Sequence, residues 1–392
     1  MEWIEEMNPW WFSERWDRDE ITLRKWRSQK IKWIPEWIKV IPLESFSLNF
    51  VVGPRQVGKT TGLKILIKKV IEKGVEPKKI IYLNCDLIAS FEELRRLMST
   101  VLKIQNEGIL ILDEVTSVEN WWKVIKGLID LGKLQKFSII ASGSSSVSLL
   151  RYSEAFTGRR GKGKNVVVLP LSFPKFAKIL KMEHGLRLSR AFEMYIQRGG
   201  FPRSVNEDES FLEEFIMSVD REISRVDRSP KIARRIIYSI IKKAPSALSF
   251  SALGKEVDLN HVTAREYAEL LEEMFLLKIA YHRENGKINF RKEKKLFLRD
   301  PFIARAFARL YSLEVRKDFL YEWIVQEHLY RKFGEIYYYR NSYEIDAIAN
   351  GLKIEVKAGK AHRRYPRDVI ILGEDDIPRF LMKLEGDSHE DV

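Results

Sequence analysis

The sequence has 392 residues, and this length allows two or three domains that each bury a hydrophobic core. Its 68 Lys and Arg residues against 55 Asp and Glu residues give a formal charge of +13, which favours polyanionic partners such as DNA. The single cysteine, Cys85, excludes an internal disulfide and a multi-cysteine metal site, as is typical of a reducing cytoplasm.

Membrane insertion and secretion are not expected. No run of about 18 apolar residues is present for a membrane span. Residues 1–10 carry acids where a signal peptide would carry bases. We therefore predict a soluble, cytoplasmic protein without a membrane partner. The abundance of Lys, Glu, Arg and Ile, with few Gln, resembles heat-adapted and archaeal sequences.

The chain begins with a Trp-rich arm, residues 1–45. Its indoles are expected to pack on the domain that follows, and stacking on nucleic-acid bases is the less favoured alternative.

From residue 46, short apolar strands alternate with amphipathic helices, which is typical of a parallel sheet with crossover helices. After Pro170, helical periodicity predominates to about Arg228 and predicts a lid or connector. These features predict a nucleotide-binding α/β domain with a helical lid over residues 46–228. Its predicted strands cover residues 46–52, 80–84, 109–112, 137–141 and 166–169.

A phosphate-binding loop lies between the first strand and the first helix of this domain. Residues 53–60 read Gly-Pro-Arg-Gln-Val-Gly-Lys-Thr, and the glycines let backbone N–H groups converge on phosphate oxygens. Lys59 would supply a cation to the β- and γ-phosphates of ATP, and Thr60 a hydroxyl to Mg²⁺. The expected nucleotide-binding residues are Gly53, Pro54, Arg55, Gln56, Val57, Gly58, Lys59, Thr60 and Thr61.

The acid that such a site requires follows the apolar run 108–112. Asp113 is expected to hold Mg²⁺ through water, and Glu114 to act as the general base that orients the attacking water. The alternative for Glu114 is a cap or a salt bridge. At the end of the next strand, Ser142 or Ser144 would sense the γ-phosphate.

A basic stretch follows, because residues 151–181 hold eight basic residues and one acid. Arg159 or Arg160 would act as an arginine finger on the ATP of a neighbouring subunit, which implies a homo-oligomer. The alternative is a solvated basic loop.

These motifs resemble those of AAA+-like ATPases of archaea and bacteria that carry a C-terminal domain called DUF4143. The resemblance implies an α/β fold with a P-loop AAA+-like parallel-sheet core. It is carried by the P-loop, Asp113-Glu114, Ser142-Gly-Ser-Ser, Gly158-Arg159, Pro170-Leu-Ser-Phe173 and Gly199-Gly-Phe-Pro202.

The order of elements in residues 229–312 predicts a winged helix. Helices are expected at 232–243, 251–257 and 263–275, followed by a basic hairpin. The exposed face of the third helix is acidic, so we expect this helix to pack rather than to read bases. Residues 278–299 hold eight basic residues against two acids and would follow a DNA backbone without sequence preference.

The last domain, residues 313–392, contains a strong hairpin signal at Asn350-Gly351. A two-residue turn there pairs residues whose numbers sum to 701, so Asp346 faces Glu355 on the polar side. Carboxylates in that position destabilise a hairpin by up to roughly 1 kcal/mol. A divalent metal between them would remove the repulsion.

Asp346 followed after eight residues by Glu355-Val-Lys357 resembles the active-site pattern of the PD-(D/E)XK nuclease superfamily, although Ile345 stands where proline is expected. The resemblance implies a small α/β restriction-endonuclease-like domain in which Asp346 and Glu355 bind Mg²⁺ or Mn²⁺. It also implies that Lys357 polarises the phosphate or the attacking water and that Glu322 completes the metal shell. The alternative is an inactive or purely structural domain.

Together these features predict an ATP-hydrolysing ATPase coupled to a DNA-binding, metal-dependent nuclease domain, acting in DNA processing or mobile-element defence. The alternative is a nucleotide-switched regulatory or scaffold ATPase with an inactive nuclease-like domain. The arrangement of Glu322, Asp346, Glu355 and Lys357 discriminates between the two, because only a nuclease requires all four around one space.

Overall fold

The computed structural model describes residues 2–144, 155–357 and 365–386. The chain forms two compact units, Met1–Leu169 and Pro170–Val392, and each contains its own sheet. Among the helices in the described ranges, none is both long enough and apolar enough to cross a membrane.

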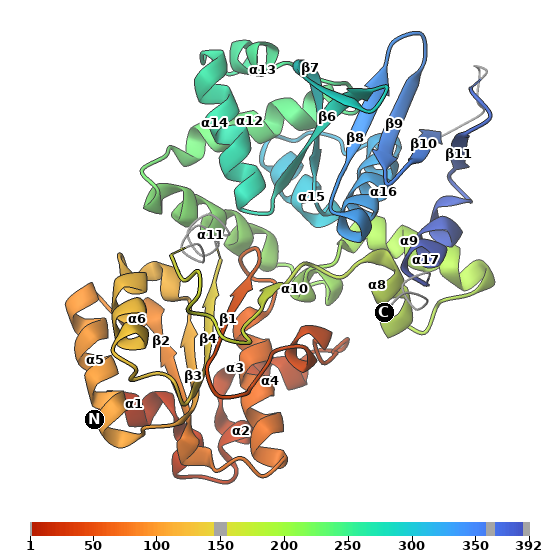
Figure 1. Cartoon of the computed structure of the whole chain (residues 1–392). Coiled ribbons are helices and arrows are strands. Elements are labelled where there is room, and N and C mark those ends of the chain that lie inside the picture. The colour runs from red at the N-terminus through yellow and green to blue at the C-terminus, as the bar shows by residue number, and fades with distance from the viewer. Residues whose placement is uncertain (1, 145–154, 358–364, 387–392) are drawn as a thin grey trace. The chain divides into compact units, whose positions relative to one another are not determined.

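The first unit is built around a parallel five-stranded sheet in the order β2-β3-β4-β1-β5 (Figure 1). Helix α4 covers one face, and α5 and α6 cover the other (Figure 1). Right-handed crossovers produce this arrangement. The connection from β1 to β2 crosses the sheet in one direction, and the connections from β2 to β3 and from β3 to β4 cross it in the opposite direction, so their helices lie on the opposite face.

All five predicted strands of this sheet are present, with ends that differ from the prediction by at most two residues. Ser90 caps α5, because its hydroxyl accepts from the backbone N–H of Glu93 at 3.2 Å. The elements are β1 (Ser47–Val52), α4 (Lys59–Glu72), β2 (Ile80–Asn84), α5 (Phe91–Ile104), β3 (Gly108–Asp113), α6 (Trp121–Asp130), β4 (Phe137–Gly143) and β5 (Asn165–Val167).

The Trp-rich arm packs on the edge of this sheet that is formed by β2. Its helices are α1 (Glu2–Met7), α2 (Trp16–Asp19) and α3 (Ile21–Ser28). Trp10 and Trp16 are buried, with ring centroids 5.0 Å apart. The indole N–H groups of Trp10 and Trp11 donate to the carbonyl of Ile80 at 3.0 and 2.9 Å. The indoles therefore pack on the following domain, as expected.

The second unit begins with a helical region in which Asp300 fixes a Gly-Gly turn. Its carboxylate accepts from the backbone N–H groups of Gly200 at 2.9 Å and Phe302 at 2.8 Å. Gly199 has a φ of 68°, and a Cβ there would lie 2.0 Å from Asp300 Oδ1, so only glycine fits. The helices are α8 (Phe173–Ile179), α9 (Gly185–Arg198), α10 (Pro202–Val205), α11 (Phe211–Arg225), α12 (Pro230–Lys243), α13 (Phe250–Glu256), α14 (His261–Glu273) and α15 (Pro301–Leu310).

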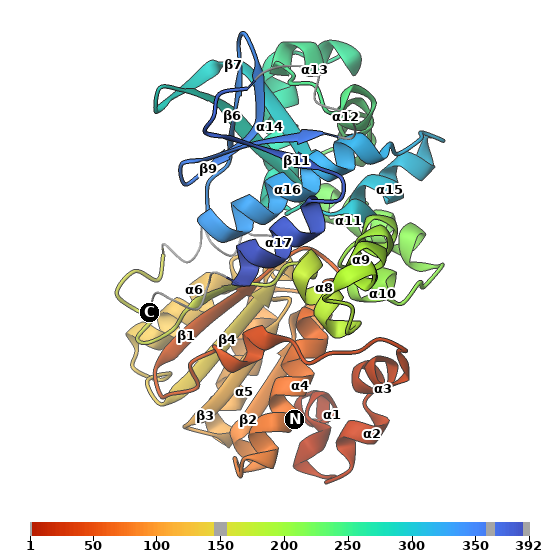
Figure 2. The same cartoon turned by 90° about the vertical axis from the view of Figure 1, so that its right-hand side faces the viewer.

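The remainder of this unit is a mixed six-stranded sheet in the order β11-β10-β9-β8-β6-β7. Helix α16 (Lys317–Phe333) packs against β9 and β10 (Figure 2), and α17 (Ile377–Gly386) packs against α16. The strands are β6 (Leu277–Glu284), β7 (Lys287–Leu298), β8 (Tyr337–Arg340), β9 (Glu344–Ala349), β10 (Leu352–Lys357) and β11 (Val369–Gly373).

This sheet differs from the expected division into domains 229–312 and 313–392. The three helices and the hairpin expected in the former are present, but β6 of the hairpin also pairs in parallel with β8. The expected boundaries at residues 228 and 312 therefore both fall inside one compact unit, which begins at Pro170. Periodicity describes each strand by itself and does not reveal which distant strand it will join.

Candidate functional site

The phosphate-binding loop joins the fully buried strand β1 to helix α4. Gly58 has a φ of 96° and Gln56 a φ of 61°, so the backbone turns sharply just before the helix. A Cβ at Gly53 would lie 2.0 Å from the carbonyl oxygen of Val168, so no larger residue fits there. A tight loop followed by a helix N-terminus presents backbone N–H groups in the arrangement that binds phosphate.

Lys59 lies between this loop and Glu114, which directly follows β3. Lys59 is 4% exposed, and its ammonium donates to the carbonyls of Gly53 at 2.9 Å and Pro54 at 3.1 Å. The same ammonium lies 3.7 Å from Oε1 of Glu114. A buried cation at the phosphate-binding loop is the group that neutralises β- and γ-phosphate charge.

Asp113, at the end of β3, is oriented by hydroxyl groups from the two neighbouring strands. Its Oδ2 accepts from the hydroxyl of Tyr82 on β2 at 2.8 Å, and its Oδ1 accepts from Ser142 on β4. Asp113 is 1% exposed. Ser142 was one of the two expected sensor residues, whereas nothing in the apolar pattern of β2 indicated a role for Tyr82.

Glu114 leaves the strand in a left-handed conformation, with a φ of 51°. Its backbone N–H donates to the hydroxyl of Ser142 at 3.0 Å, so the same serine contacts both acids. One carboxylate oxygen, Oε1, faces Lys59, and the other is buried without a hydrogen-bond partner among the described residues. A buried carboxylate oxygen that lacks a donor has the acceptor capacity that a general base requires.

These residues fit a nucleotide with Mg²⁺. The first turn of α4 carries the hydroxyl of Thr60, and β3 carries the carboxylate of Asp113, which are the hard oxygen donors that Mg²⁺ prefers. The parallel register aligns the carboxyl ends of β1, β3 and β4. The loop, the acids and Ser142 therefore lie together at the carboxyl ends of these strands.

Arg159 and Arg160 do not lie at the carboxyl ends of these strands. The carbonyl of Arg160 accepts from the backbone N–H of Leu48, near the start of β1, while the loop follows its end at Gly53. Five residues of strand span about 16 Å, beyond the reach of an arginine side chain. Arg159 instead pairs with Asp130 at 2.5 Å. The register therefore places Arg159 and Arg160 away from the phosphate-binding loop of their own chain.

The C-terminal hairpin has the predicted register. Leu352 pairs with Ala349 and Ile354 with Ala347, so the paired numbers sum to 701. The backbone N–H of Val356 donates to Oδ2 of Asp346 at 2.9 Å. The polar face of the hairpin thus carries Asp346 and Glu355, as expected.

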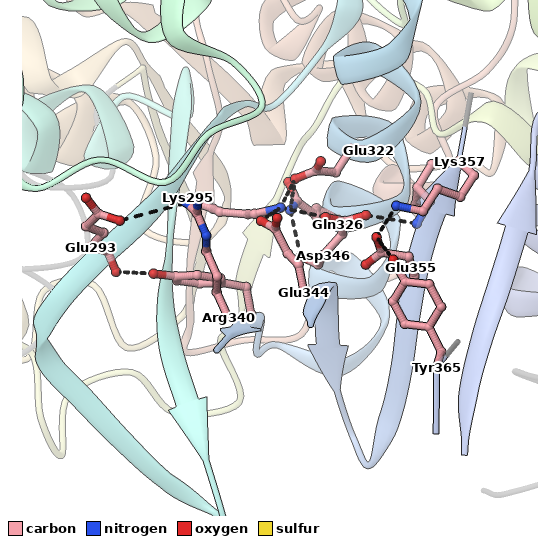
Figure 3. Close-up of polar contacts among 12 residues, drawn as sticks. Glu293, Lys295, Glu322, Gln326, Arg340, Glu344, Asp346, Glu355, Lys357 and Tyr365 are labelled. Atoms are coloured by element: carbon pink, nitrogen blue, oxygen red, sulfur yellow. Dashed lines mark hydrogen bonds and ion pairs between the residues drawn. The ribbon is translucent and has the colours of Figure 1, made fainter. Parts of the chain in front are cut away.

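A buried lysine from β7, Lys295, lies between Asp346 and two further acids, Glu322 and Glu344 (Figure 3). The ammonium of Lys295 lies 2.8 Å from Glu322 Oε1, 2.6 Å from Asp346 Oδ1 and 3.0 Å from Glu344 Oε1. Lys295 is 2% exposed. Burial alone would lower the pKa of Lys295, but the three carboxylates raise it well above its usual value, so the ammonium stays charged.

Glu355 has separate partners next to this cluster (Figure 3). Its Oε1 accepts from Lys357 and, at 2.9 Å, from the hydroxyl of Tyr365, while Oε2 is buried without a partner among the described residues. Burial and the charge of Asp346 raise the pKa of Glu355 to about 7. Burial and Asp346 also raise the pKa of Glu322 well above its usual value.

Asp346 and Glu355, the residues expected to bind a metal, have other partners in the structure. The cation beside Asp346 is the ammonium of Lys295, and Glu355 is paired with Lys357. Across the described ranges, no group of three or more His, Cys, Asp and Glu side chains has an arrangement that could hold a metal ion. The only signal for Lys295 in the sequence is its position directly before the apolar run 296–298, which puts it where the hairpin becomes buried.

The strand, loop, helix and acids of the first unit define the class of P-loop nucleotide-binding proteins. More particularly, residues 45–177 match an AAA domain (AAA_14). Residues 189–314 match a domain of unknown function, DUF8612. The expectation of DUF4143 is therefore corrected: the order of motifs resembled that family, but the residues after the AAA-domain match are similar to DUF8612.

The chain is similar to a protein named MJ1544 from Methanocaldococcus jannaschii. The two are 29% identical over 278 residues, which are 64% of this chain and 58% of that protein. The chain thus spans less than two thirds of the length of this relative.

Solved structures with a similar arrangement include three proteins. The Aeropyrum pernix ORC2 protein has a TM-score of 0.40 at 11% identity over 75% of this chain and 94% of that one. The Aeropyrum pernix ORC1 protein in complex with DNA has a TM-score of 0.34 at 11% identity over 67% and 86%. The Thermotoga maritima Holliday junction branch migration motor RuvB has a TM-score of 0.34 at 15% identity over 69% and 88%.

Proposed function

We propose that the chain is an Mg²⁺-dependent ATPase whose hydrolytic centre lies at the carboxyl ends of β1, β3 and β4 in the first sheet. The observation that carries the proposal is the contact between Lys59 and Glu114, which links the phosphate-binding loop to the acids of β3. Lys59 would bind the β- and γ-phosphates, and Thr60 and Asp113 would hold Mg²⁺, which stabilises charge on the phosphates. Glu114 would accept the proton of the attacking water at Oε2.

Replacing Glu114 with Gln should preserve ATP binding and slow hydrolysis about 100-fold or more, because the amide keeps the size of the side chain but cannot act as a base. Equilibrium dialysis with ATP and phosphate release measure the two effects separately. The neighbouring exposed Glu119→Gln is the matched control and should hydrolyse ATP at the wild-type rate. Loss of ATP binding in Glu114→Gln would show that the roles of the two acids are wrongly assigned.

For the second unit, we favour an ATP-switched regulatory or scaffold role over DNA cleavage. The helices and hairpin of residues 229–312 and the small α/β part that follows them would then bind a partner. Lys295 supports this choice, because an ammonium within 3.0 Å of Glu322, Asp346 and Glu344 uses the oxygens that a catalytic metal would need. A second copy of the chain would be the partner of Arg159.

DNA is the partner that the β6–β7 hairpin fits best. Its pairing shifts from Tyr281–Lys294 to His282–Asn289, so residues 290–293 bulge out of the ladder. Arg291 and Lys292 in this bulge are exposed, and Phe290 is 64% exposed. Cations beside an exposed aromatic ring suit a sugar-phosphate backbone and an unstacked base.

Removing both cations, Arg291→Ala with Lys292→Ala, should weaken DNA binding and make it less dependent on salt. The slope of log K against log salt should fall in magnitude by about 2, since each lost phosphate contact contributes about 0.9. Fluorescence anisotropy with labelled duplex and single-stranded DNA measures the slope. The matched control, Arg187→Ala with Arg190→Ala, removes two exposed charges from α9. Equal slopes in the two double variants would exclude the hairpin as the DNA contact.

A further inference from the structure

The N-terminal arm satisfies the outer backbone groups of the edge strand β2 with side chains. The side-chain amide of Asn8 donates to the carbonyl of Tyr82 at 2.9 Å and accepts from its N–H at 2.7 Å. The indoles of Trp10 and Trp11 donate to the carbonyl of Ile80, and the N–H of Asn84 lies 3.3 Å from the sulfur of Met7. An edge strand is thus covered as a partner strand would cover it.

The contacts that Asn8 makes fix the backbone of Tyr82, and other contacts fix its ring. The ammonium of Lys64, on α4, lies 3.5 Å from the centroid of the Tyr82 ring, and the ring of Trp10 packs edge-on at 6.4 Å. Lys64 is 5% exposed and Tyr82 is 4% exposed. The ring therefore has contacts from both the arm and the helix that starts at the phosphate-binding loop.

The hydroxyl of this fixed ring is aimed at Asp113. It donates to Oδ2 at 2.8 Å, opposite the Ser142 hydroxyl on Oδ1. Burial and the charge of Asp113 raise the pKa of Tyr82 well above its usual value, so the phenol remains a donor. A carboxylate with a donor on each oxygen is restrained against rotation.

We propose that Tyr82 is a positioning residue of the ATPase centre, held in place by Asn8 and Trp10 of the N-terminal arm so that Asp113 presents one carboxylate orientation to Mg²⁺. This inference rests on the proposed ATPase activity. It assigns the arm a role in hydrolysis in addition to its packing, because the contact chain runs from Asn8 through Tyr82 to Asp113.

Tyr82→Phe tests the role of the hydroxyl, because it removes only that group and keeps the ring between Lys64 and Trp10. The Mg²⁺ concentration for half-maximal ATP hydrolysis should rise roughly tenfold, as expected for the loss of one hydrogen bond to a charged group. The rate at saturating Mg²⁺ should stay within about twofold of wild type. A purely structural tyrosine would instead lower the melting temperature and leave the Mg²⁺ dependence unchanged.

Asn8→Ala tests the role of the arm and carries the test if Tyr82→Phe folds poorly. It should shift the Mg²⁺ dependence in the same direction by several-fold. Trp11→Phe is the control, since it removes a hydrogen bond to Ile80 and leaves the contacts of Tyr82 intact. Wild-type Mg²⁺ dependence in both Tyr82→Phe and Asn8→Ala, in a chain that hydrolyses ATP, would overturn this inference alone. Absence of Lys59-dependent hydrolysis in the wild type would instead overturn the proposed function.

Discussion

Replacing Lys295 with Met should lower the free energy of unfolding of the second unit by about 3–5 kcal/mol, the range for removing one partner of a buried ion pair. Methionine fills a similar volume but leaves Glu322, Asp346 and Glu344 close together without a cation. All three lie within 3.0 Å of the Lys295 ammonium, and Lys295 is 2% exposed, so water cannot replace it. Chemical denaturation followed by far-UV circular dichroism measures the loss.

The matched control is Lys292→Met, on the same strand but exposed, which should change stability by less than about 0.5 kcal/mol. Asp346→Asn alone should also destabilise, because Asp346 is a partner of Lys295. The sequence by itself predicts the opposite sign for this variant, from repulsion between Asp346 and Glu355. A double variant less destabilised than the sum of the two single changes would show their coupling. A more stable Asp346→Asn would contradict the assignment of Lys295.

Lys59→Ala should reduce ATP hydrolysis by about 10²–10³-fold, the usual effect of removing one preorganised donor to transition-state charge. The variant should still fold, because the contacts of Lys59 are with two loop carbonyls and Glu114. Phosphate release at saturating ATP measures the rate, and a thermal melt checks the fold. Lys73→Ala, exposed just after α4, is the control. Wild-type turnover in a folded Lys59→Ala protein would place ATP hydrolysis elsewhere.

The parts of the structure that the sequence predicts are those determined by local interactions. The turn at Asn350-Gly351 fixes the register of β9 and β10 because only two residues separate the strands. The spacing of its glycines predicts the P-loop. An apolar run that ends in an acid predicts the position of Asp113. Each of these signals lies within about a dozen residues of chain.

The contacts that the sequence does not predict connect distant segments. Lys295 and Asp346 are 51 residues apart, and they meet only because the six strands take one particular order. Tyr82 and Asp113 are 31 residues apart on neighbouring strands. The apolar pattern of a strand predicts that a tyrosine in it is buried, but it does not predict which group the tyrosine hydroxyl contacts. The paired carboxylates indicate that a positive charge lies beside Asp346, but the sequence does not show that the Lys295 ammonium is the group there.

The most direct test is to measure phosphate release from ATP and cleavage of duplex and branched DNA in the same Mg²⁺ and Mn²⁺ reactions, for wild type, Lys59→Ala and Asp346→Asn, below their melting temperatures. We predict that wild type and Asp346→Asn release phosphate, that release by Lys59→Ala is slower by about 10²–10³-fold, and that the DNA remains intact in every reaction. Metal-dependent cleavage by wild type that is lost in Asp346→Asn would contradict a single hydrolytic centre at the P-loop, because it requires a metal where Lys295 lies.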